Sequence, residues 1–196
     1  MKKIEQNKKL KIQRIQKAAQ KLFQSNGFVG TSMDKIAEEA DVTKQTVYRY
    51  FESKEALFKS ALEAQRLAAS NDFLDALDLD DTTKALNAFA IGFIKRHLSK
   101  AHLANVRLLV AEGPKVPEIT RAFYAVGPTR TKTHLARFFK ERFDIEDAAY
   151  EIDVFLSILL SMRMTVLTGL AAPPSSEVIR THAAKAVSAV LKLLDL

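Results

Sequence analysis

Apolar residues recur at three- and four-residue steps through most of the chain, which is the spacing of an amphipathic helix. In residues 11–26 these steps run from Ile12 to Phe23, and Gly27 follows where glycine commonly ends a helix. The same spacing predicts helices over residues 33–40, 44–50, 53–70, 82–99, 101–112, 117–143, 146–169 and 175–194. We expect Gly127-Pro128 to kink or break the helix 117–143. No segment of note alternates as a β-strand would, so we predict an all-α fold of about nine helices.

The two short helices at 33–40 and 44–50 form a predicted helix-turn-helix. Thr43 can cap the second of them, because its hydroxyl can accept a free N–H group of the first turn. A helix of about seven residues is not stable alone, so Val47 and Phe51 are expected to pack inward. This pattern is typical of three-helix DNA-binding domains, in which the third helix enters the major groove.

The charge of the chain lies almost entirely in its first third. The net charge is +7 over 196 residues, and residues 1–66 hold 14 Lys and Arg against 8 Asp and Glu. Residues 67–196 hold 16 against 15. A basic segment joined to a nearly neutral one indicates that the first third meets a polyanion such as DNA, the alternative being a solvated basic tail.

Several classes of protein are disfavoured. The chain has no cysteine, which excludes disulfide scaffolds and thiolate metal sites. Its four histidines have no carboxylates at ligand spacing, and no nucleophile motif or phosphate-binding loop is present, so we expect no metal, cofactor or enzymatic activity. The basic start is not a signal peptide, and Arg163 interrupts the apolar run 154–170, so we expect a cytoplasmic protein without a membrane span.

A longer motif covers residues 27–58. It combines Thr-Ser before the second helix, an Ile-Ala pair within it, Val-Thr-Lys before the third, Tyr-x-x-Phe at its end and Ser-Lys-Glu-x-Leu after it. In these features the chain resembles the TetR/AcrR family of transcriptional regulators, and residues 107–124 resemble one branch of it. The resemblance implies a helix-turn-helix DNA-binding domain over residues 1–54 and a helical ligand-binding and dimerisation domain over residues 55–196.

The resemblance also implies a dimeric repressor that binds a palindromic double-stranded DNA operator and releases it on binding a small effector. The residues that it places at the DNA are Thr31, Ser32, Thr43, Lys44, Gln45, Thr46, Tyr48, Arg49, Tyr50 and Lys54. Thr31, Ser32 and Thr43 would meet phosphates at helix starts, where free N–H groups point at an anion. Tyr50 and Lys54 would bind other phosphates.

Two positions of the motif depart from the family pattern. Asp41 stands in the turn where glycine is frequent, and aspartate tolerates a left-handed backbone better than most residues. Gln45 stands where a small residue is frequent. Because glutamine can bind adenine with two hydrogen bonds, Gln45 is the leading candidate for base reading; the alternative is a contact with phosphate or water.

The effector candidates are Phe89, Phe93, Phe123, Tyr124, Met162 and Arg163. Apolar stripes of this kind belong to a core more often than to a pocket, but the resemblance implies a cavity, and methionine adapts to varied ligands. Arg163 is a lone charge in an apolar helix and needs a partner, for which Glu112, Asp153 or an acidic ligand are candidates. Alternatively it reaches solvent or crosses a dimer interface.

The resemblance implies that the last two predicted helices form a homodimer interface. One face of the final helix carries Ile179, Ala183, Ala186, Val187, Val190 and Leu194. The helix 53–70 is expected to run from the DNA-binding part into the sensor part and to be the only stiff element that couples them. Two rival interpretations stay open: a DNA-binding protein without a ligand, and a helical enzyme, which the missing nucleophile–base pair disfavours.

Overall fold

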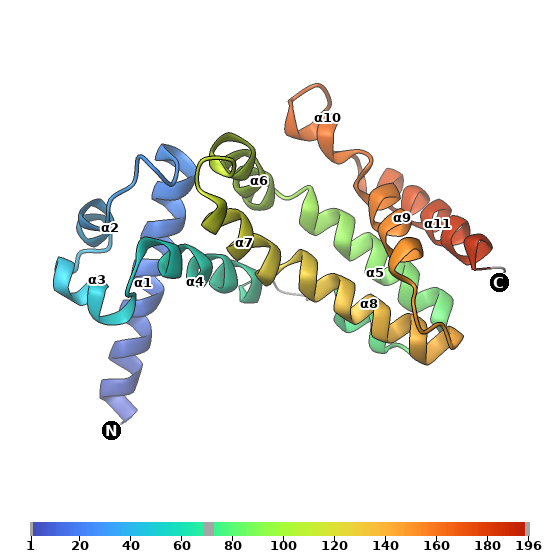
Figure 1. Ribbon diagram of the computed structural model, residues 1–196, viewed down its shortest axis with the longest axis horizontal. Coiled ribbons are helices and arrows are strands. Elements are labelled where there is room, and N and C mark those ends of the chain that lie inside the picture. Colours follow the sequence, from blue (N-terminus) through green and yellow to red (C-terminus); the bar gives the residue numbers. More distant parts are fainter. Residues whose placement is uncertain (1, 69–72, 195–196) are drawn as a thin grey trace. The chain divides into compact units, whose positions relative to one another are not determined.

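The structure, a computed structural model, describes residues 2–68 and 73–194, and within these ranges it contains helices and no strand (Figure 1). In chain order the elements are α1 (Lys2–Asn26), α2 (Met33–Glu39), α3 (Lys44–Tyr50), α4 (Lys54–Leu67), the 3-10 helix η1 (Asp75–Asp78), α5 (Thr82–His97), α6 (Lys100–Glu112), α7 (Pro117–Val126), α8 (Pro128–Phe143), α9 (Ala149–Leu160), α10 (Arg163–Leu167) and α11 (Ser176–Leu193). The all-α prediction is confirmed.

The chain folds as two compact units, each with its own apolar core. The first unit comprises Met1–Ala69 and Ala104–Gly127, and the second comprises Ser70–Leu103 and Pro128–Leu196. This division differs from the boundary expected after residue 54, because α4 belongs wholly to the first unit. The helix α6 is continuous and begins in the second unit and ends in the first.

Within its described residues, the helix predicted over 53–70 does not enter the second unit, and its role as the only coupling element stays a prediction. The helix ends at Leu67, inside the first unit, and the expected extension to Ser70 falls on residues outside the described ranges. The backbone element that the two units share is α6.

Three phenylalanines form the centre of the first unit. The rings of Phe23 in α1, Phe28 in the following loop and Phe58 in α4 lie 5.3 to 5.6 Å apart, centroid to centroid. Ile36 of α2 and Val47 of α3 are fully buried in the same core. One cluster thus holds the helix-turn-helix to α1 and α4.

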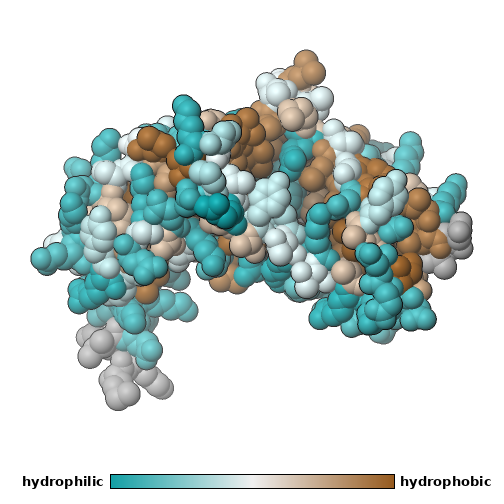
Figure 2. Space-filling model, viewed as in Figure 1, coloured by the Kyte–Doolittle hydropathy of each residue, from teal (hydrophilic) through white to brown (hydrophobic). Residues whose placement is uncertain are grey.

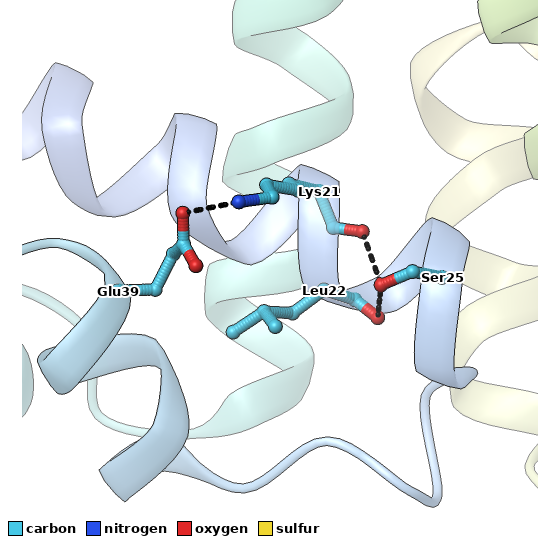
Figure 3. A network of polar contacts seen from close by, with 4 residues as sticks. All are labelled: Lys21, Leu22, Ser25 and Glu39. Carbon is cyan, nitrogen blue, oxygen red and sulfur yellow. Dashed lines mark hydrogen bonds and ion pairs between the residues drawn. The ribbon is translucent and has the colours of Figure 1, made fainter.

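Polar contacts also fix α1 to the helix-turn-helix. Lys21 Nζ lies 2.7 Å from Glu39 Oε1 at the end of α2, and Ser25 Oγ donates to backbone carbonyls of the preceding turn (Figure 3). Arg14 donates to the carboxylate of Asp41 at 2.8 Å. Asp41 has φ of 50°, so the left-handed turn expected there is confirmed.

The second unit is built around α5, α9 and α11. Phe89 and Phe155 are fully buried, and Phe89 and Phe93 stack with 5.6 Å between ring centroids. Val187 and Val190 of α11 are buried in this core, at 2% and 0% exposure. The apolar face of α11 that was expected to form the dimer interface therefore packs within the protomer against α5 and α9.

The break expected at Gly127-Pro128 is found between α7 and α8, since proline disfavours the helical conformation of the residue before it. Two other boundaries differ from the predicted ones. The helix predicted over 146–169 divides between α9 and α10. The first helix begins well before residue 11, because good helix formers without an apolar stripe give no periodic signal. No described helix is long and apolar enough to span a membrane.

Two histidines of the second unit are close together. The rings of His97 and His102 lie 4.4 Å apart, centroid to centroid, and His97 packs on Phe93 at 3.8 Å. Burial lowers the pKa of His97 from 6.5 to about 4, and the positive charges of Arg163 and Arg96 add to this effect. Burial likewise lowers the pKa of His102 to about 2, with His97, Arg163 and Arg96 contributing.

We expect the protein to lose stability as the pH falls from about 7 to about 5. Below pH 6.5 the imidazoles bind protons in the unfolded chain but stay neutral in the folded protein. The free energy of unfolding therefore has its full value above pH 6.5 and decreases as the pH falls below it. His102→Phe keeps a ring but removes one titrating group. Urea unfolding should therefore show a smaller loss than in the wild type, by at most about 1.4 kcal/mol per pH unit.

The matched control is Tyr150→Phe, at an exposed position of the same unit, which should behave as the wild type does. An equal acid-induced loss of stability in His102→Phe and in the wild type would contradict the assignment.

Candidate DNA-reading surface

The short helix α3 is held at its start by a cap and along one side by burial. The Thr43 hydroxyl accepts the Thr46 N–H at 3.2 Å, as predicted, and the two hydroxyls lie 2.9 Å apart. Val47 is fully buried and Phe51, directly after the helix, is 7% exposed. These contacts fix which side of α3 faces solvent.

The exposed side of α3 is polar and basic. Lys44, Gln45, Tyr48 and Arg49 are all exposed, and steps of three and four residues place Gln45, Tyr48 and Arg49 on one face. The surface around the helix-turn-helix is largely hydrophilic in Figure 2. The face offers an amide, a phenol and one cation, and Lys44 beside it adds a second cation; such groups suit base edges and phosphates.

Lys44 is engaged with Asp34 of α2. The Nζ–Oδ1 distance is 2.9 Å, and the hydrogen bond raises the pKa of Lys44 above its ordinary value. Both side chains are more than half exposed, and such ion pairs contribute little to stability. Lys44 can therefore leave Asp34 for a DNA phosphate at small cost.

Three of the predicted contact residues have inward-facing polar groups. Thr31 is 1% exposed, and its hydroxyl donates to the carbonyls of Gly27 and Leu22. Thr46 is 9% exposed and bonds to Thr43. Ser32, which is not one of the three, is exposed; it is the N-cap of α2 and accepts the Lys35 N–H at 3.2 Å.

Lys54 is the third predicted contact residue whose polar group faces inward. Its ammonium donates to the carbonyls of Phe28 and Thr31, at 2.7 and 2.9 Å, and lies 4.4 Å from the centroid of the Phe28 ring. The phosphate contact predicted for Lys54 stays a prediction, and the structure shows its ammonium bonded to the loop before α2. Tyr50 is half-buried, with the Arg49 guanidinium 5.7 Å from its ring centroid.

Glu112 of α6 bonds to the same loop, a contact that the sequence analysis did not predict. Its Oε2 accepts the Val29 N–H at 2.9 Å. The carboxylates expected to pair with Arg163 are thus engaged elsewhere, because Asp153 is bonded to Lys132. No local pattern links residues 83 positions apart, so the sequence offered no signal for this contact.

The effector candidates are divided between the units. Phe89 and Phe93 are packed core residues of the second unit, and Met162 and Arg163 are half-buried at the start of α10. Phe123 and Tyr124 belong to the first unit, with Tyr124 56% exposed. Among the described residues, no three His, Asp or Glu side chains are placed to hold a metal ion.

A groove of about 760 Å³ lies within the first unit, between α1 and α4. Its lining includes the polar side chains of Lys8, Gln13 and Gln16 and the apolar side chains of Ile12, Ala64 and Leu67. The groove therefore offers both apolar surface and groups that can form hydrogen bonds.

Comparison with known proteins identifies the family. The family model for bacterial regulatory proteins of the tetR family matches residues 15–61, and that for the C-terminal domain of AefR-like transcriptional repressors matches residues 84–193. The chain belongs to the TetR family. Family members are DNA-binding regulators rather than enzymes, and they typically act as dimers with small-molecule effectors.

Two solved TetR-type structures match almost the whole chain. A TetR-family regulator from Mesorhizobium loti is 26% identical with a TM-score of 0.79, and covers 95% of this chain and 97% of its own. The flavonoid-responsive regulator FrrA is 30% identical with a TM-score of 0.74, and covers 93% and 96%. The repressor NicS of Pseudomonas putida is 39% identical over 89 residues, which span 42% of this chain and 41% of NicS.

The three cationic and amide side chains Lys44, Gln45 and Lys54 should respond differently to replacement by alanine. Gln45→Ala should relax preference at one operator base pair, by about 1–3 kcal/mol. Lys44→Ala should lower the affinity for DNA of every sequence by the same factor. It should also reduce the magnitude of the slope of log affinity against log salt by about one per protomer. Lys54→Ala should lower the melting temperature without lowering that slope, because its ammonium binds the protein's own carbonyls.

Affinity measurements on matched and mismatched duplexes over a salt series check these roles. A Lys54→Ala slope reduced as much as that of Lys44→Ala would show that Lys54 binds phosphate after all.

Proposed function

We propose that this protein is a dimeric transcriptional repressor that binds a palindromic operator through α3 and releases it on binding a planar, apolar or weakly acidic small molecule. The observation that carries the proposal is the arrangement of α3 in a TetR-family chain. The helix is capped at its start and buried along one side, and it exposes Gln45, Tyr48 and Arg49 on one face. NicS, named a repressor, supports the sign of regulation.

The nature of the effector is supported by likeness and by charge. FrrA is flavonoid-responsive and resembles this chain over nearly its full length. In the second unit, the positive charge of Arg163 helps to lower the pKa of both His97 and His102. Phe89, Phe93, Met162 and Arg163 are proposed to contact a planar ligand, and the roles of Phe123 and Tyr124 stay predictions.

The proposed dimer uses the outer faces of α9 and α11. Because Val187 and Val190 lie in the protomer core, the surface left for a partner is the opposite side of α11, which exposes Val178, Ser188 and Leu193. Short side chains such as Ser188 permit close helix packing. Two copies of one patch related by a two-fold axis would produce a closed dimer.

Ser188→Arg should convert the dimer to a monomer, because it places a bulky charge at the centre of the proposed interface. Thr133→Arg, at an exposed position of α8, is the matched control and should stay dimeric. Sedimentation velocity at micromolar concentration checks both; a wild-type monomer there would contradict the proposed dimer.

A hydroxylated flavonoid should lower operator affinity by about 5–150-fold, and operator DNA should lower flavonoid affinity by the same factor, since coupling between binding sites is reciprocal. Arg163→Gln should weaken the response to this ionisable phenol more than to its O-methyl ether. Fluorescence anisotropy with operator DNA and calorimetry with the flavonoid measure the two factors.

If no planar aromatic or weakly acidic compound in a panel changes operator affinity, the regulator without an effector is the better interpretation.

A further inference from the structure

The loop between α1 and α2, residues 27–31, is bound by side chains of α4 and α6 and by one of its own. Lys54 of α4 donates to the carbonyls of Phe28 and Thr31. Glu112 accepts the N–H of Val29 at 2.9 Å. The Thr31 hydroxyl donates to the Gly27 carbonyl at 2.7 Å. Opposite charges thus hold opposite backbone groups of one short loop.

Glu112 lies directly against the start of this loop. A Cβ atom built on Gly27 would lie 2.0 Å from Glu112 Oε1, far inside van der Waals contact. Gly27 also has φ of 77°, in the left-handed region that favours glycine. The turn at Gly27 therefore leaves room for the carboxylate to approach the backbone.

The helix α6 is itself fixed in the first unit along one stripe. Asn105, Leu108 and Glu112 follow each other at steps of three and four residues, so they share a face. Asn105 is 5% exposed; it accepts from Gln24 of α1 at 3.0 Å and donates to Gln65 of α4 at 2.7 Å. Leu108 is buried in the core, so the stripe ends with Glu112 on the loop.

The loop leads directly into the helices that read DNA. It ends at Ser32, the cap of α2, and α2 packs against α3. We propose that Glu112 is a positioning residue for DNA reading, through which α6 holds the α1–α2 loop and so sets the position of α2 and α3. This inference rests on the proposed function and adds to it the contact by which a displacement of α6 reaches the reading helices.

The bond is of a kind that a conformational change can break. Val29 is 62% exposed and Gly30 is also exposed, so the loop is not locked by burial on this side. The Phe28 ring, by contrast, stays in the core with Phe23 and Phe58. Loss of the Glu112 contact should therefore loosen the loop while the unit stays folded.

The test compares Glu112→Ala with Glu112→Gln, whose amide oxygen can still accept the Val29 N–H. The matched control is Glu118→Ala, which removes a carboxylate of α7 that pairs only with Arg121 among its described contacts. We measure hydrogen exchange at the Val29 amide, and affinity for an operator selected from random duplexes by the wild type, over a salt series.

In Glu112→Ala, the Val29 amide should exchange on the order of tenfold faster than in the wild type. Its affinity for the operator should be on the order of tenfold lower. The salt slope should stay at the wild-type value, because no phosphate contact is removed. Glu112→Gln and Glu118→Ala should both stay within about threefold of the wild type in exchange and affinity.

Wild-type exchange or wild-type affinity in Glu112→Ala would overturn the inference, as would an equally large loss in Glu112→Gln. A reduced salt slope in Glu112→Ala would also overturn it, because it would indicate lost phosphate contacts. If the wild type selects no sequence at all, the proposed function fails and the inference falls with it. If the wild type selects an operator that Glu112→Ala binds normally, the inference alone fails.

Discussion

A helix of seven residues cannot hold its shape in water, and the candidate base-reading side chains stand on such a helix. The first unit is arranged around this constraint. Thr43 caps α3, Val47 anchors it in the core, and α2 supports it from one side. The exposed face then has a defined orientation, so the contacts proposed for Gln45, Tyr48 and Arg49 would need little further ordering on binding.

Local interactions were predictable from the sequence. The cap formed by Thr43 was expected because it depends on a group within three residues, and it is found. Lys54 and Glu112 were not predictable, since their partners are backbone groups of a loop 23 to 83 residues away. For Val187 the stripe predicted burial correctly, but an apolar stripe does not say whether the protomer or a partner covers it.

The two units divide the charge and the chemistry. The first holds most of the basic excess and the reading helix, and the second holds the phenylalanine core with its half-buried imidazoles and Arg163. Only differential affinity of a ligand for two states can shift DNA binding. In this account, α6 links the two because its first residues belong to the second unit and Glu112 ends on the loop before α2.

Selection of bound fragments from a pool of random DNA duplexes by the purified protein tests the central claim most directly. The account predicts enrichment of a two-fold-symmetric sequence whose half-site centres lie about one helical turn, roughly 34–36 Å, or a multiple of it apart. The enriched base preference should be relaxed at one position of each half-site when Gln45 is replaced by alanine. A pool that stays random after repeated rounds, or a sequence selected equally well without the α3 side chains, would contradict the account.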